Sequence, residues 1–155
     1  GPRSGGNGLG ILHRFQGHVI GGPRKFPPHQ PKWGYQPVGS ITWLRWIGGA
    51  GKPPEKQFYR GDGHRTTEHG AFNLELAKTY HLKSRSTTLE DTAEGLGVTR
   101  YQFKIWEMDT EEPAVWDFDE TQESASALRS GGAALIAHHV DVTFGNVVIY
   151  DHTDV

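Results

Sequence analysis

Residues 101–108 constrain the fold more than any other part of the chain, because their side chains alternate in character. Tyr101, Phe103 and Ile105 fall on one side of an extended chain, and Gln102 and Lys104 fall on the other. Period-two alternation is typical of a strand with one face in a core and the other in water. We therefore expect a sheet with one buried face.

Other segments extend this prediction to most of the chain. β-branched and aromatic residues, bounded by glycine and proline, predict strands at 40–47, 57–60, 114–118, 133–142 and 146–150. Residues 71–82 mix alternation with good helix formers, and we favour a strand there.

Two short helices are expected beside these strands. A hydroxyl followed by carboxylates at 86–91 is typical of a capped helix start, and Gly95 or Gly97 would end that helix. Residues 122–128 predict a further helical turn. The expected fold class is α+β and β-rich, with split or mixed antiparallel sheets around a cleft and a few short helices.

The 155 residues suit one domain, preceded by an arm. Residues 1–39 hold six of the nine prolines and ten of the 21 glycines, so we expect no long helix or interior strand there. Within this arm, residues 1–6 have the composition of a cloning remnant, and 9–15 and 18–20 are apolar islands that would dock on a core. The single β-rich domain is expected at 40–155.

Charge is distributed unevenly, although the net charge is only -2. Residues 1–54 carry seven Lys or Arg and no acidic residue, whereas 105–155 carry eleven acidic residues and a single basic one, Arg129. The basic part either meets an anionic partner or packs back on the acidic part. No apolar run is long enough to span a bilayer, so no membrane span is expected. The absence of Cys excludes disulfides and thiolate zinc sites, and it leaves the compartment open.

Arg60 is the first candidate functional residue, because it stands where an aromatic strand meets a glycine-containing loop. Its guanidinium offers a planar fork of donors that suits a phosphate, a carboxylate or a dinucleotide pyrophosphate. The alternative is that Arg60 pairs with Asp62 or with an acidic residue of the acidic part.

The order of motifs resembles the ADP-ribosyltransferases of the arginine-serine-glutamate class, which includes bacterial toxins. The resemblance covers about residues 58–148. It rests on three stretches in order: Phe58-Tyr59-Arg60-Gly61-Asp62, then Ser86-Thr87-Thr88, then Glu120-Thr121-Gln122-Glu123. Thr88 stands where the family has a last serine, and Thr121 stands where it has a carboxylate or glutamine.

The resemblance implies a role for each of these residues. Arg60, Ser86 and Glu123 would be catalytic, with Glu123 stabilising the oxocarbenium-like transition state as nicotinamide leaves. NAD would be the substrate, with no metal, and Thr121 and Glu120 would orient the target. The residues implied in NAD binding are Tyr59, Arg60, Gly61, Asp62, Ser86, Thr87 and Thr88.

The resemblance thus implies a mono-ADP-ribosyltransferase or NAD glycohydrolase. Such a protein would be a soluble toxin or effector, secreted or delivered, acting on an unidentified macromolecular target. The chemistry is coherent in itself, because an anionic dinucleotide needs a cation and a developing ribosyl cation needs a carboxylate.

Two non-catalytic alternatives stay open. The basic arm, with its Trp and Tyr residues and with Trp43 and Trp46 beyond it, would suit RNA or DNA, provided that the two Trp residues share one face. An interaction domain without catalysis is the other. A metal is not expected, because adjacent His138 and His139 would point to opposite faces of a strand and the spacing of His64 and His69 matches no common zinc pattern.

Overall fold

The computed structural model describes residues 7–20, 35–37, 39–48, 51–60 and 66–151. The strands of the larger sheet are β1 (Asn7–Phe15), β4 (Ser40–Trp46), β5 (Glu55–Tyr59), β6 (Thr66–Ala71) and β10 (Gly132–His138). The smaller sheet contains β7 (Tyr80–Leu89), β8 (Gly97–Glu107) and β9 (Phe118–Ser124). A separate ladder joins β2 (His18–Ile20) to β3 (Tyr35–Pro37).

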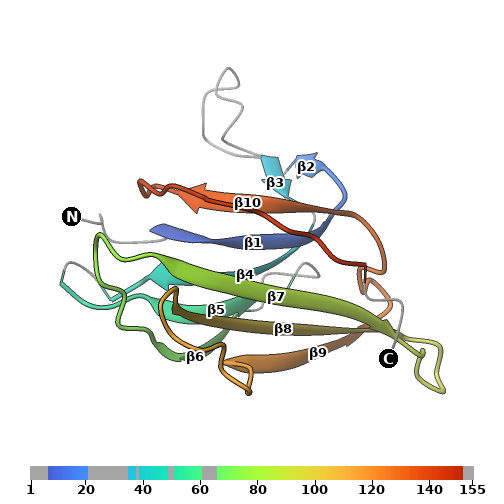
Figure 1. The fold of residues 1–155 in the computed structure, drawn as a ribbon. Helices are drawn as coiled ribbons and strands as arrows, with labels where there is room; N and C mark the ends of the chain where they lie inside the picture. The colour runs from blue at the N-terminus through green and yellow to red at the C-terminus, as the bar shows by residue number, and fades with distance from the viewer. Residues whose placement is uncertain (1–6, 21–34, 38, 49–50, 61–65, 152–155) are drawn as a thin grey trace.

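The two main sheets are antiparallel and face each other as a sandwich (Figure 1). The larger has the order β10-β1-β4-β5-β6, and the smaller has the order β7-β8-β9. The β-rich antiparallel class is therefore confirmed, as are the strands expected at 40–47, 57–60 and 101–108. The strand expected at 133–142 is confirmed as far as residue 138, and residues 139–142 lie beyond its end. The described residues form no helix, and none of them makes a helical segment capable of crossing a membrane.

The core lies between the sheets and confirms the alternation of residues 101–108. Tyr101 and Phe103 of β8 are fully buried, and Phe58 of β5 meets Tyr101 with ring centroids 4.8 Å apart. Leu9 and Leu44 extend the same cluster across β1 and β4. Burial of each such side chain contributes about 1.5–3 kcal/mol, so this cluster holds the two sheets together.

The expectation that residues 1–39 hold no interior strand is wrong, because β1 lies between β10 and β4. Gly8 and Gly10 weaken a strand in isolation, but here they leave room for the side chain of Trp43 on β4. A Cβ atom on Gly10 would lie 2.4 Å from the Trp43 Cβ, and one on Gly8 would lie 2.7 Å from its ring. The glycines are therefore a packing requirement of an interior strand.

Both predicted helices are wrong, because each segment continues a strand. Residues 86–89 belong to β7, where Ser86 faces Tyr101, and residues 122–124 belong to β9, where Gln122 is fully buried. Tertiary pairing has overridden the local helix signals. Strand structure within 71–82 is limited to Ala71 and to residues from Tyr80 onward, and 114–117 are a loop. The strand predicted at 146–150 is also wrong, because no strand is assigned to these residues and no ladder of the described residues includes them.

Charged side chains join the larger sheet to β9 and to the loop before it. Lys56 Nζ lies 2.7 Å from Asp117 Oδ1, and an Arg60 nitrogen lies 3.3 Å from Glu120 Oε2. Lys56 and Arg60 follow the basic part, which ends at residue 54, so these pairs leave both alternatives for the basic part open.

Candidate functional site

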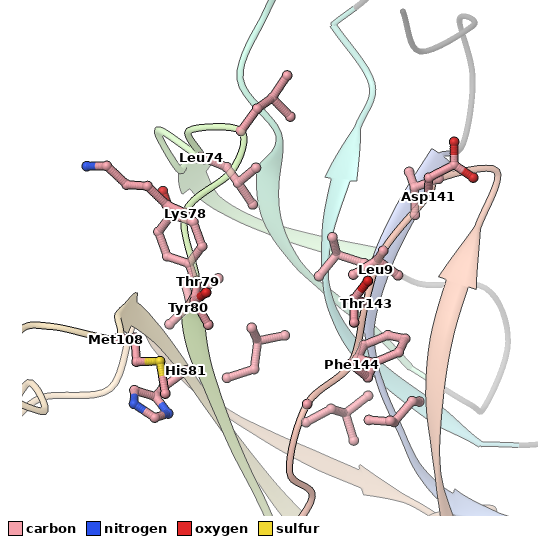
Figure 2. Close-up of a pocket in the computed structure, with 18 of the residues that line it drawn as sticks. Leu9, Leu74, Lys78, Thr79, Tyr80, His81, Met108, Asp141, Thr143 and Phe144 are labelled. Carbon is pink, nitrogen blue, oxygen red and sulfur yellow. The ribbon is translucent and has the colours of Figure 1, made fainter.

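A groove of about 1390 Å³ opens between β1 and β7 (Figure 2). Leu9 of β1 and Leu82 of β7 contribute apolar side chains to it. In Figure 2, Tyr80 stands on one side of the groove, and Thr143 and Phe144 stand on the other. The volume exceeds the roughly 300–1,000 Å³ of typical small-molecule pockets, so a larger and elongated ligand fits it better.

One wall of the groove is formed by residues 142–148, which have no strand partner among the described residues. We call residues 142–150 the unpaired segment. No strand is assigned to it, and none of the backbone hydrogen bonds found among the described residues involves it. Val147, Val148, Ile149 and Tyr150 are 57%, 64%, 76% and 76% exposed. Contiguous exposed apolar residues of this kind mark an interaction surface.

The opposite wall is the outer edge of β7, which pairs with β8 and with no other strand of the described residues. The Thr79 carbonyl accepts a hydrogen bond from the Met108 N–H at 2.9 Å, and Tyr80 faces Glu107 in the register. Hydrogen-bonded and non-hydrogen-bonded pairs alternate along antiparallel strands. The backbone groups of Tyr80 and Leu82 therefore point away from β8, toward the groove.

Protein-family models, curated proteins and solved structures give no match to this chain. Its function is therefore argued from the residues and their geometry.

Arg60 lies in a charged cluster away from this groove. One nitrogen of its guanidinium lies 3.3 Å from Glu120 Oε2, and His69 Nε2 lies 3.1 Å from Glu120 Oε1. The His69 ring stacks on Phe118 with centroids 4.4 Å apart. Burial lowers the pKa of His69, although the Glu120 carboxylate opposes the shift. Arg60 thus pairs with an acidic residue of the acidic part, and its fork is already partly occupied.

The other two residues implied in catalysis project from different faces of the smaller sheet. Ser86, Tyr101 and Glu120 stand opposite one another in register, and Tyr101 is buried between the sheets, so this row faces inward. Glu123 follows the fully buried Gln122 and is exposed. Because neighbouring strand residues point to opposite faces, Glu123 projects away from the Arg60–Glu120 pair.

The remaining residues implied by the resemblance are also dispersed. Thr121 alternates with Glu120 and shares the outward face with Thr87, since both flank Arg100 in the register. The Thr88 hydroxyl donates to the Arg129 carbonyl at 3.3 Å. Tyr59 packs on the outer face of the larger sheet, in the cluster around Leu12, Ile41 and Trp43. Gly61 and Asp62 lie outside the described residues.

The two Trp residues considered for nucleic-acid stacking do not share a face. Trp43 is 8% exposed and covers the glycines of β1, whereas Trp46 packs against the core between the sheets and lines the groove. Trp33 and His64 lie outside the described residues. Among the residues that are described, no group of three acidic or His side chains is arranged to hold a metal ion.

Sequence reasoning missed an aromatic surface on the outward face of the smaller sheet. Lys104 Nζ lies 4.7 Å from the ring centroid of Trp116 and 5.8 Å from that of Trp106. The Arg85 guanidinium carbon lies 5.6 Å from the Trp116 ring centroid, and the His81 ring lies tilted against Trp106 with centroids 5.1 Å apart. The alternation within 101–108 could have placed Lys104 and Trp106 together on the outward face. The loop that brings Trp116 onto the same face has no sequence signature.

Proposed function

We propose that this chain is a non-catalytic interaction domain that binds an extended polypeptide strand in the groove between β7 and the unpaired segment. The observation that carries the proposal is the pair of backbone edges that face each other across an apolar floor, neither of which pairs with another strand in the part of the chain that the structure describes. A strand placed between them would satisfy both edges, and its side chains would cover Leu9 and Leu82. Addition of a strand to a sheet edge is a common mode of peptide recognition.

The alternatives fit the groove less well. A small ligand would fill only part of the volume and would leave the backbone groups of β7 unpaired. Water can hydrogen-bond to these groups, but it cannot cover the exposed apolar side chains of the unpaired segment. A polypeptide strand supplies alternating donors and acceptors at the spacing of a β-ladder together with apolar side chains, which matches both kinds of surface.

The test is calorimetric titration with a synthetic peptide of alternating Val and Thr residues. We expect saturable binding by the wild type. Leu82→Pro removes an edge N–H without removing a hydrogen bond to β8, and Leu82→Ala removes similar packing but keeps the N–H. The proline variant should bind more weakly than the alanine variant, by roughly two- to tenfold for one hydrogen bond.

Two results would contradict this function. One is the absence of binding by any strand-forming peptide, with the wild type shown to be folded. The other is equal affinity of Leu82→Pro and Leu82→Ala, since the free edge would then contribute nothing. A peptide with N-methylated alternate amides is the matched ligand control, because it keeps the side chains and cannot form the ladder.

A second candidate function is carbohydrate binding on the outward face of the smaller sheet. The observation that favours it is the presence of two indole rings, Trp106 and Trp116, on this face. Glu112 bridges Lys83 and Lys104, which holds the pKa of Glu112 at about 2 and compensates part of their charge. Indole rings flanked by hydrogen-bond donors suit the apolar faces and the hydroxyl groups of a sugar. Titration with neutral oligosaccharides tests it, and Trp106→Ala should abolish binding while Val115→Ala on the neighbouring loop should not.

The ADP-ribosyltransferase reading stays a prediction and is less favoured by the geometry. Arg60 is engaged by Glu120, and Glu123 projects from the opposite face of the sheet from Glu120. Release of nicotinamide from NAD by the wild type, lost in Glu123→Gln, would restore that reading.

A further inference from the structure

We infer that the strand taken up by the groove is residues 142–150 of a second copy of this chain, exchanged reciprocally in a two-fold dimer. The inference rests on the proposed function, because it identifies the partner of the same groove. The unpaired segment has what the groove requires. It contains no turn or bend, it carries no Lys, Arg, Asp or Glu, and it is rich in β-branched and aromatic residues.

Chain direction makes the exchange geometrically consistent. In Figure 1, β7 and the red trace that follows β10 run in the same direction toward the end marked C, and both line the groove. A strand that runs opposite to both is antiparallel to both. A two-fold axis beside the unpaired segment supplies such a strand, because the partner's segment then runs the opposite way.

The resulting order is β7 of one copy, the partner's unpaired segment, the first copy's own unpaired segment, and β7 of the partner. Each segment then has a neighbour on both sides, and each β7 gains its missing neighbour. The smaller sheets of the two copies become one continuous antiparallel sheet. A single contact thereby satisfies the free edges of both β7 strands and both edges of each segment, which no pairing of the segment with its own β7 alone achieves.

The area is sufficient for a stable dimer. A segment of about 1,000 Da exposes about 1,450 Å² as an unfolded chain, at about 1.45 Å² per dalton. If about half of that becomes covered, and the groove loses a similar area, two exchanges bury roughly 2,900 Å², against about 1,200–2,000 Å² for a standard interface. The buried surface is mostly apolar, as in obligate dimers.

Sedimentation equilibrium across a concentration series tests the dimer. We expect the wild type to have twice the mass of one chain. Val148→Glu should raise the dissociation constant at least about hundredfold, because each dimer would bury two unpaired carboxylates. Val115→Glu is the matched control: Val115 is 75% exposed in the loop before β9, far along the chain from the segment, and this variant should stay dimeric.

Cysteine scanning gives an independent readout, because the chain has no Cys of its own. Single cysteines are placed in turn along residues 144–149 and oxidised. Antiparallel two-fold pairing puts one position opposite itself, so disulfide-linked dimer should peak at one position and fall on both sides. Equal cross-linking at all positions would overturn the antiparallel arrangement.

Three outcomes overturn the dimer, and they differ in whether the proposed peptide-binding function survives. A monomer that binds the Val-Thr peptide retains the interaction function but excludes the second copy as occupant. A monomer whose Leu82 and Val148 amides are protected from hydrogen exchange shows that the segment pairs with its own β7. A monomer that binds no peptide and shows no protection at these amides removes the proposed function as well.

Discussion

Protonation of His13 is predicted to loosen the contact between the two sheets. His13 projects from β1 into the core and is 6% exposed. Its Nε2 lies 3.1 Å from Thr42 Oγ1 of β4 and 2.7 Å from Ser84 Oγ of β7, so it links the larger sheet to the smaller one. Burial, helped by the positive charge of Arg14, lowers the pKa of His13 from 6.5 to about 4.

The sign of the effect follows from proton linkage. The unfolded chain binds a proton at His13 below pH 6.5, whereas the folded chain does so only near pH 4. The contribution of His13 to the unfolding free energy is therefore fully present above pH 6.5 and is lost as the pH falls toward 4. A difference of about 2.5 between the two pKa values corresponds to about 3 kcal/mol of unfolding free energy.

Urea unfolding at a series of pH values between 7 and 4 measures this loss. The His13→Gln variant keeps a polar side chain but cannot titrate, so its unfolding free energy should fall much less over the same range. His81→Gln removes an exposed histidine and serves as the control, with the pH dependence of the wild type. If His13→Gln and the wild type lose stability in parallel, desolvation of His13 is not the cause.

Three further substitutions test other contacts. Gly10→Ala should destabilise the fold by more than about 1–3 kcal/mol, because its Cβ would overlap the backbone and side chains of β4, and thermal unfolding measures the loss. Arg14→Met should cost roughly 1–3 kcal/mol, because the guanidinium donates to the Leu128 carbonyl at 2.5 Å in a buried site; urea unfolding at constant pH should show it. Glu120→Gln should lower the pKa of His69 further, since the carboxylate now opposes the effect of burial, and an NMR titration that shows no change would contradict the contact.

The sequence predicted the fold where pattern and burial agree. Residues 101–108 alternate because β8 has one face against the core, and residues 40–47 have the composition of an interior strand. β1 was not predicted because glycine disfavours a strand. The glycines are required because Trp43, more than thirty positions away in the sequence, packs against them. Pairing partners of this kind are invisible to a local pattern.

The candidate site, like the fold, was predicted only in part from the sequence. Arg60 was selected from its position at a strand end, and pairing with the acidic part was an explicit alternative, which the Glu120 contact bears out. Glu123 was selected from motif order, which carries no information about strand faces. A one-residue difference in position separates Gln122 in the core from Glu123 in water, so the face of a residue depends on strand register.

The segment 146–150 carries a strand signal that a single copy of the chain does not realise. Its residues have strong strand propensity, yet no strand is assigned there and no strand of the described residues pairs with it. Propensity for a strand expresses how well side chains fit a pleated, half-buried surface, and the groove beside this segment offers such a surface. A segment with this composition therefore implies a partner edge. The free edge of β7 lies on the other side of the same groove, and a second copy supplies both missing neighbours at once.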